Sequence, residues 1–177
     1  MNMRASLRSV IIFLIVFGAL QAIWTSSAGV WIERLWVEGL TVPVATLVLN
    51  ALNSDLNATA EGSRIIAPGG GLNILQGCDG IDAVFILIAG FAAVSMGFQR
   101  RMAGMLMGLL FVFVLNQLRI LALFTAFRND RQLFNFLHTS ALPLMLVVLT
   151  ALFFHYWIGR GKRSEPEIRA ATQSVAK

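Results

Sequence analysis

Residues Met102–Phe127 read MAGMLMGLLFVFVLNQLRILALFTAF, and Arg119 is the one charged residue in this run. A helix needs roughly 20 mostly apolar residues to cross about 30 Å of hydrocarbon, so the run is long enough to span a membrane. Of the 177 residues, 57% are apolar and 13% are charged, whereas a soluble domain has about a quarter charged residues. The composition therefore predicts an all-α integral membrane protein.

Three further apolar runs are long enough to cross a bilayer, namely Leu7–Thr25, Ile81–Phe98 and Thr139–Ile158. Pro143 falls near the start of the last run, where a missing N–H group costs a helix least. We therefore expect about four transmembrane helices. The predicted regions are a first transmembrane helix (1–26), outer interfacial helices with a small β-hairpin (27–80), a three-helix membrane core (81–158) and a disordered cytoplasmic tail (159–177).

The charges predict how these helices are oriented. The two termini and the loop at 99–101 hold nine basic residues against two acidic ones, a net charge of +7. The remaining connections hold four basic residues against seven acidic ones, a net charge of −3. Because loops rich in Lys and Arg stay in the cytoplasm, both termini should be cytoplasmic. The basic residues flank membrane segments and form no single stripe, so we expect a lipid bilayer and no nucleic acid as the partner.

The first span has a second interpretation. Arg4, Arg8, the apolar run from Val10 and the small residues at 26–28 also fit a cleavable signal peptide. Cleavage would remove the first span without inverting the others.

The segment between the first two spans is the largest part expected outside the membrane. Val30–Asn53 is apolar with interleaved charges, which favours helices that lie on the outer interface or re-enter the bilayer. Ser63–Ile66 and Leu72–Leu75 flank a turn rich in Pro and Gly, which predicts a hairpin, although an unstructured linker is the alternative. Tryptophans expected at headgroup level are Trp24, Trp31 and Trp36.

Cys78 is the only cysteine, in the stretch QGCDGID at 76–82. A single cysteine excludes an intramolecular disulfide and a site with several thiolates, so the thiol is either an inert buried group or a reactive one. Its position at the outer N-terminus of the second span favours a thiolate, because free N–H groups and the helix dipole are positive there.

Arg119 lies eight residues before Phe127, which is roughly 12 Å below the outer end of its helix. A charge inside a membrane is a functional candidate by default, since it costs about 2.5 to 3.5 kcal/mol to insert. Asn116 lies three residues earlier, on the same helix face. The structural alternative is an arginine that snorkels or neutralises Asp79 or Asp82.

His138 opens the fourth span and should lie on the same side and at a similar depth as Cys78 and Arg119. Charge counts alone give this agreement, without any assumption about chemistry. His155 precedes the basic tail and belongs to the inner interface, so it cannot serve the same site.

The order of these motifs, a Cys-x-Gly at 78–80, an Asn-x-x-Arg at 116–119 and His138, resembles the exosortase/archaeosortase family of membrane cysteine transpeptidases, most closely the short bacterial exosortase H type. The resemblance covers about residues 62–158. It implies that Cys78 is the nucleophile, Arg119 the essential arginine and His138 the third catalytic residue. One departure is Asp79, whose carboxylate would raise the pKa of the thiol unless it points away, is paired or is outweighed.

The resemblance implies a bacterial inner-membrane enzyme with its active site at the outer face and with no cofactor or metal. Its substrates would be membrane-tethered proteins whose C-terminal sorting signal has a short motif, a transmembrane helix and a basic end. Residues expected to support the site are Asn116, Asn135 and Arg131.

Three other functions fit parts of the sequence. A non-enzymatic assembly or export subunit would use Arg119 to pair with another chain. A transporter would need a polar stripe along several spans, and outside 116–119 the helical runs contain almost nothing polar. A metal hydrolase would need a fuller ligand set than Cys78 and His138.

Overall fold

The computed structural model describes the chain at 3–74 and 77–175, with side chains at 6–26, 30–74 and 77–160. Most described residues are helical, and a small sheet lies in the middle of the sequence. In chain order the elements are α1 (Met3–Trp24), α2 (Ser27–Glu33), the π-helix η1 (Arg34–Thr41), α3 (Val42–Leu52), the 3₁₀-helix η2 (Ser54–Leu56), β1 (Thr59–Glu61), β2 (Arg64–Ala67), β3 (Gly70–Asn73), α4 (Ile81–Ala93), α5 (Phe98–Asn129), α6 (Arg131–Phe136), the π-helix η3 (Leu137–Ala141) and α7 (Leu142–Val175).

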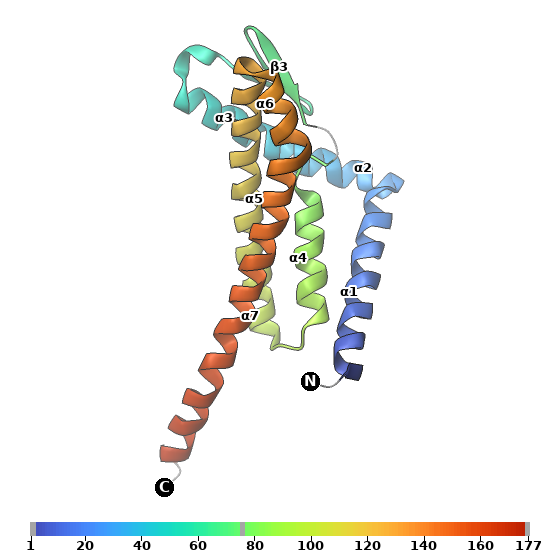
Figure 1. The fold of residues 1–177 in the computed structure, drawn as a ribbon, viewed down its shortest axis with the longest axis vertical. Helices are drawn as coiled ribbons and strands as arrows, with labels where there is room; N and C mark the ends of the chain where they lie inside the picture. The colour runs from blue at the N-terminus through green and yellow to red at the C-terminus, as the bar shows by residue number, and fades with distance from the viewer. Residues whose placement is uncertain (1–2, 75–76, 176–177) are drawn as a thin grey trace.

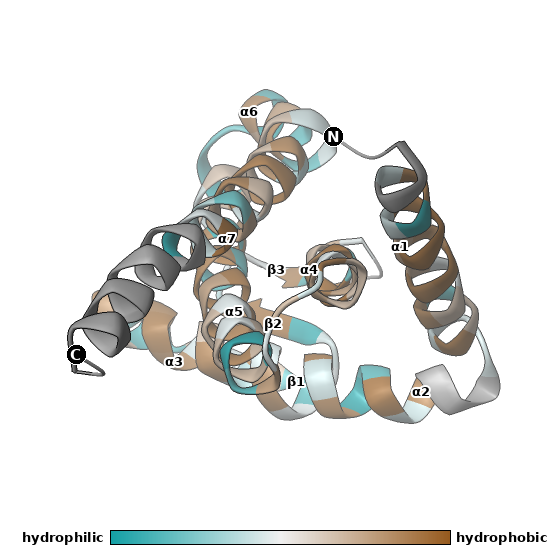
Figure 2. Cartoon of the chain, turned by 90° about the horizontal axis from the view of Figure 1, so that it is seen from below, coloured by the Kyte–Doolittle hydropathy of each residue, from teal (hydrophilic) through white to brown (hydrophobic). Residues whose placement is uncertain are grey.

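The helices form a bundle whose two ends differ (Figure 1). Helices α1, α4, α5 and α7 run along its length, with α1 packed on α4, and α5 packed on both α4 and α7. The sheet lies at one end, and both termini and the α4–α5 connection lie toward the other. The long helices consist mostly of hydrophobic residues (Figure 2), and many large apolar side chains are exposed, for example Leu14, Leu110 and Leu144, at 60%, 58% and 66%. Such an apolar exterior suits contact with lipid.

Four helical stretches are long and apolar enough to cross a membrane, as the sequence predicts, but one of the four differs. Three of them, Ser6–Trp24, Phe98–Asn129 and Arg131–Arg160, contain expected spans. The fourth is Val30–Leu52, and Figure 1 shows that this stretch lies across the long helices and not along them. The expected span Ile81–Phe98 is instead the 13-residue helix α4, about 20 Å long.

The boundary between α4 and α5 explains the shorter helix. The backbone leaves the helix at Val94, and α5 begins at Phe98, three residues after Ser95. Arg100, which the sequence places in a loop, is in the first turn of α5. Its guanidinium donates hydrogen bonds to the carbonyls of Trp157 and Ile158 on α7, at 2.6 and 3.0 Å. Helix α5 can therefore include the charge of Arg100, because carbonyl groups of α7 accept its hydrogen bonds.

Both π-helical segments end directly before a proline-bearing helical turn. Pro43 follows η1 by two residues, and Pro143 follows η3 by two residues. Proline has no N–H group and its ring crowds the carbonyl four residues earlier, so the ladder of i to i−4 bonds cannot continue through it. A local π-turn absorbs the mismatch without ending the helix.

The sheet has three antiparallel strands in the order β1-β2-β3, where the sequence predicts a two-stranded hairpin. Strands β2 and β3 pair around the expected Pro-Gly turn, with Arg64 opposite Asn73 and Ile65 opposite Leu72. The second predicted strand begins two residues too late, and its last residue, Leu75, lies outside the described residues. The additional strand β1 is short and exposed, so it has no apolar alternation that a sequence pattern could reveal.

The buried core continues from the sheet into the bundle. Side chains from β2 and β3, including Ile65 and Leu72, pack with Ile120 and Leu123 of α5 in one apolar cluster, which also contains Cys78. Trp24, expected at the lipid headgroups, is instead 6% exposed and packs edge-on against Phe85.

Helix α7 extends to Val175, through the segment that the sequence predicts as a disordered tail. This segment is rich in Lys, Arg, Glu and Ala, which are good helix formers, so it can prolong a helix that has already started.

Candidate active site

Cys78 lies in the turn that leads from the sheet into α4, and its side chain is 8% exposed. Gly80 caps α4 in a left-handed conformation, with φ of +77°. A Cβ atom at Gly80 would lie 2.7 Å from Cγ of Asn116, so both the turn and the close approach of α5 require glycine. The Cys-x-Gly pattern thus has a local structural reason.

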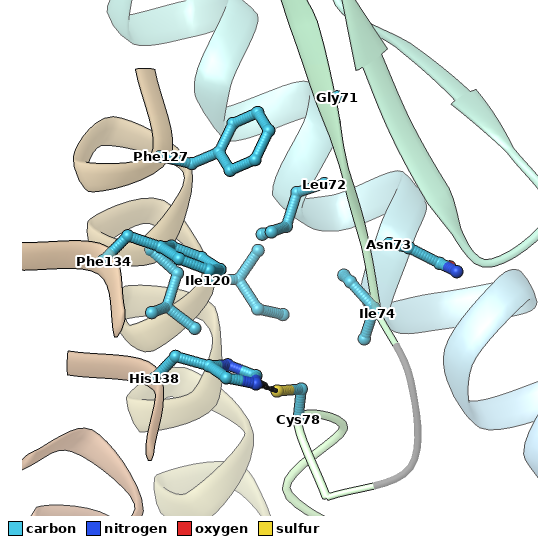
Figure 3. Close-up of a pocket in the computed structure, with 10 residues that line it drawn as sticks. Gly71, Leu72, Asn73, Ile74, Cys78, Ile120, Phe127, Phe134 and His138 are labelled. Atoms are coloured by element: carbon cyan, nitrogen blue, oxygen red, sulfur yellow. Dashed lines mark hydrogen bonds between the residues drawn. The ribbon is translucent and has the colours of Figure 1, made fainter. Parts of the chain in front are cut away.

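His138 lies beside Cys78, although sixty residues separate them (Figure 3). The Cys78 sulfur is 3.2 Å from Nδ1 and 3.8 Å from Nε2 of the imidazole. His138 is in the π-segment η3, one turn after Phe134, and the two rings stack with centroids 5.4 Å apart and planes 8° apart. The stacking constrains the plane of the imidazole, and Nδ1 is the nitrogen nearer to the sulfur.

Arg119 reaches the same turn from α5. Its Nη2 donates to the carbonyl of Gly77 at 3.1 Å and lies 3.6 Å from the Cys78 sulfur. The side chain is 3% exposed, and its Nε is buried without a hydrogen-bond partner among the described residues. The described bonds of Arg119 therefore join it to the Cys78 turn, and not to the carboxylates of Asp79 or Asp82.

Two more donors hold the turn on the other side of Cys78. The carbonyl of Asp79 accepts hydrogen bonds from Asn116 Nδ2 at 2.9 Å and from Trp36 Nε1 at 3.0 Å. Asn116 is fully buried, whereas Trp36 is half-buried in η1. Together with the bond from Arg119 to Gly77, these contacts fix the carbonyls on both sides of the cysteine.

The sequence gives no signal for the position of Trp36. It belongs to an amphipathic stretch in which Trp31 and Trp36 look alike, and no spacing relates residue 36 to residue 79. The contact exists because the chain from α2 to α3 crosses the bundle beneath the sheet, a tertiary feature that local patterns do not encode.

The carboxyl group of Asp79 is buried next to the cysteine and is fully inaccessible to solvent. Its Oδ1 accepts the N–H of Ile81 at 3.2 Å, and its Oδ2 has no partner among the described residues. Burial raises the pKa of Asp79 to about 6, and the nearby charges of Asp82 and Glu33 contribute in the same direction. The carboxyl group is therefore protonated over part of the weakly acidic range.

Cys78 itself is a thiol at rest. Burial raises the pKa of Cys78, the positive charge of Arg119 lowers it, and the negative charge of Asp79 raises it, with a net pKa above its ordinary value. The helix dipole and Arg119 thus do not ionise the Cys78 thiol by themselves. A base within reach must accept its proton. His138 is in the position to be that base.

A cavity of about 350 Å³ opens above Cys78 and His138 (Figure 3). In Figure 3 the β3 side of the cavity faces the aromatic rings of Phe127 and Phe134 across the opening. The lining residues are Gly71, Leu72, Asn73, Ile74, Cys78, Ile120, Leu123, Phe127, Phe134 and His138. Most of this lining is apolar, so the cysteine and the imidazole supply its reactive groups.

The remaining residues that the sequence analysis singled out lie at different distances from Cys78, Arg119 and His138. Arg131 stacks over the ring of Phe127, 4.5 Å from its centroid, and so supports the rim of the cavity. Asn135 is exposed, and its described contact is a backbone carbonyl that accepts from the Thr139 hydroxyl at 2.6 Å. His155 is exposed on α7, roughly 25 Å farther along the helical stretch than His138 at 1.5 Å per residue. Among the residues with described side chains, no group of three or more His, Cys, Asp or Glu could hold a metal ion.

Comparison with protein families gives one result, a match of residues 3–155 to the model described as "Transmembrane exosortase (Exosortase_EpsH)". The match covers most of the chain. The chain belongs to the transmembrane exosortase family. No curated protein and no solved structure matches it.

Proposed function

We propose that this exosortase is a membrane cysteine transpeptidase or protease that cleaves the C-terminal sorting signal of exported proteins through a thioester on Cys78. One observation supports this most strongly. The Cys78 sulfur lies 3.2 Å from an imidazole nitrogen and 3.6 Å from a guanidinium nitrogen, at the end of a cavity. A nucleophile within hydrogen-bond distance of a base is the arrangement that covalent catalysis needs.

In the first step, His138 accepts the thiol proton as the Cys78 sulfur attacks the scissile carbonyl carbon. Because the thiol has a raised pKa, proton transfer and attack occur together. The C–S bond forms, and the carbonyl π electrons move to the oxygen. Arg119 is close enough to the sulfur to stabilise this oxyanion, and its Nε–H has no partner among the described residues.

In the second step, the tetrahedral intermediate collapses and the C–N bond breaks. The imidazolium of His138 gives its proton to the leaving amine, which departs with the transmembrane helix and basic end of the substrate. The upstream protein remains bound to Cys78 as a thioester. Water or the nucleophile of an acceptor then attacks this carbonyl, His138 takes up the proton of the attacking group, and the returning sulfur recovers a proton as the thiol.

The proposed location is the inner membrane of a bacterium, with both termini in the cytoplasm and the active site at the outer face. The charge distribution supports it, since nine basic residues lie at the termini and the 99–101 turn. In Figure 1 these regions lie away from the sheet and the Cys78 turn. A substrate with a transmembrane helix and a basic cytoplasmic end would then present its motif beside Cys78.

The test is processing of a co-expressed exported protein whose C-terminus has a short motif, one apolar span and a terminal Arg cluster. Cys78→Ala and Arg119→Ala should leave the substrate uncleaved while the protein still inserts in the membrane. Cys78→Ser is a harsher version, because serine lacks the acidity of a thiol. Normal processing by Cys78→Ala would reject the nucleophile assignment and favour a non-enzymatic membrane subunit.

A further inference from the structure

Strand β3 has one unpaired edge beside the active site. Among the described strands the sheet order is β1-β2-β3, so β3 pairs with β2 and leaves its other side free. An unpaired edge presents backbone N–H and C=O groups that can template another strand.

The register identifies which backbone groups are free. The N–H of Ile74 donates to the carbonyl of Ser63 at 2.8 Å, and Asn73 lies opposite Arg64. In an antiparallel ladder, hydrogen-bonded and non-bonded pairs alternate, so Leu72 exchanges bonds with β2. Gly71 and Asn73 therefore direct their N–H and C=O groups away from β2, toward the free edge.

The cavity follows this edge. Gly71, Leu72, Asn73 and Ile74 all line it, although side chains alternate between the two faces of a strand. Figure 3 shows the Asn73 side chain pointing away from the cavity, so Asn73 lines it mainly through its backbone. The edge therefore faces a space large enough for a peptide backbone, and the same cavity ends at Cys78.

We propose that an extended segment of the substrate adds to the free edge of β3 as a fourth strand, which brings the scissile carbonyl to Cys78. This inference rests on the proposed function, and it states how that function's substrate binds. Main-chain hydrogen bonds to Gly71 and Asn73 would supply affinity. Alternate substrate side chains would face the apolar wall of Phe127 and Phe134, and the others would point outward. The enzyme would thus read an alternating pattern around the scissile bond.

A pair of matched electrophiles tests strand addition without a known substrate. Acetyl-tetraalanyl chloromethyl ketone and chloroacetone share the reactive group, from which the Cys78 sulfur displaces chloride, but only the first has a peptide backbone. On the full chain in detergent, mass spectrometry of the Cys78 peptide measures both alkylation rates. We expect the peptide reagent to react more than about tenfold faster, the change that one or two main-chain hydrogen bonds provide.

Methylation of the four alanine nitrogens, one at a time, tests the register. A strand directs alternate N–H groups to its neighbour, so methyl groups on one alternate pair of nitrogens should lower the rate about fivefold or more, and those on the other pair should change it less than about twofold. Equal effects at all four positions, or no advantage over chloroacetone, would overturn strand addition.

Asn73→Pro provides the complementary change in the enzyme. It removes an N–H that faces the free edge and leaves the bonds between β2 and β3 intact. The ratio of the peptide-reagent rate to the chloroacetone rate should lose most of its excess, because only the peptide can use the missing N–H. A ratio equal to that of the native chain would contradict strand addition. If Asn73→Pro does not fold, the methylation series on the native chain decides alone.

Failure of strand addition and failure of the proposed function give different results. A Cys78 that neither reagent alkylates would reject the proposed function together with this inference. A Cys78 that reacts normally with chloroacetone, but gains nothing from the peptide, would reject strand addition and leave the function standing.

Discussion

The two π-helical segments, η1 and η3, both precede a proline and both supply an aromatic side chain to the Cys78 turn, but they act on it differently. Through His138, η3 contacts the sulfur itself, at 3.2 Å. Through Trp36, η1 contacts the carbonyl of the next residue, Asp79, at 3.0 Å. The first contact can move a proton, and the second can only hold the backbone. Substitutions in η1 and in η3 should therefore have effects that differ in size and in kind.

The largest effect is expected at the segment that touches the sulfur. His138→Ala should lower the rate of substrate processing by roughly 10²- to 10⁴-fold, because it removes the base and acid for both steps. His155→Ala is the matched control, since His155 is exposed on the same helical stretch and remote from Cys78. Equal rates for the two variants in a processing assay would remove His138 from the mechanism.

The next effect belongs to α5, which contacts both the sulfur and the backbone. Arg119→Gln should lower the processing rate by about 10²- to 10³-fold, the usual consequence of losing an oxyanion donor. Arg128→Gln is the control, because Arg128 lies over the ring of Phe124, 5.8 Å from its centroid, outside the Cys78 turn. A processing rate in Arg119→Gln that matches the control would show that Arg119 serves folding alone.

A smaller effect is expected at η1. Trp36→Phe keeps an aromatic ring near Phe113, which Trp36 packs against edge-on, and removes the bond to Asp79. Since Asn116 still donates to the same carbonyl, the loss should be about 1 kcal/mol, roughly fivefold in rate. Trp31→Phe, at a 69% exposed position, should change nothing. A loss in Trp36→Phe as large as that in His138→Ala would erase the distinction between the two segments.

The last effect concerns stability and not the processing rate, and it lies in the pH dependence of the turn that both segments contact. The pKa of Asp79 is raised to about 6 in the folded protein, so the folded state binds this proton more tightly than the unfolded state. Stability should therefore fall as the pH rises from about 4 to 6 and should then stay level, with a total cost of roughly 3 kcal/mol. Asp79→Asn should remove this fall in thermal unfolding measured across pH.

Asp79→Asn should also change the reactivity of the cysteine. The negative charge of Asp79 raises the pKa of Cys78, so its removal should shift the pH profile of iodoacetamide alkylation to lower pH. If Asp79→Asn changed neither the alkylation profile nor the stability curve, folding would not raise the pKa of Asp79, and its charge would not act on the Cys78 thiol.

The sequence was sufficient to predict that Cys78, Arg119 and His138 lie together, because membrane topology is a strong constraint. Charge bias determines the sides of the membrane, and helix rise determines depth, so Cys78, Arg119 and His138 could be assigned to one level from counting alone. The structure brings His138 and Arg119 within hydrogen-bonding distance of the Cys78 sulfur. Asn116 was assigned to the same site by the same reasoning, and it binds the Asp79 carbonyl.

The supporting features could not be predicted in the same way. The role of Trp36 depends on how the α2–α3 stretch crosses the bundle, which no local period encodes. The position of Arg100 inside α5, and not in a loop, depends on acceptors that α7 offers to it. The third strand, β1, is held by its pairing with β2 and has no burial pattern of its own. Each of these depends on contacts between segments far apart in the sequence.

Direct detection of the acyl-enzyme tests the central claim, that Cys78 carries the substrate as a thioester. The native chain and a co-expressed sorting-signal substrate would be quenched in acid, and the Cys78 peptide would be weighed by mass spectrometry. The expected species is Cys78 bearing the upstream substrate fragment, which neutral hydroxylamine releases and which is absent from Cys78→Ala. A cleaved substrate with no adduct on Cys78 at any time, and with cleavage undiminished in Cys78→Ala, would contradict the account.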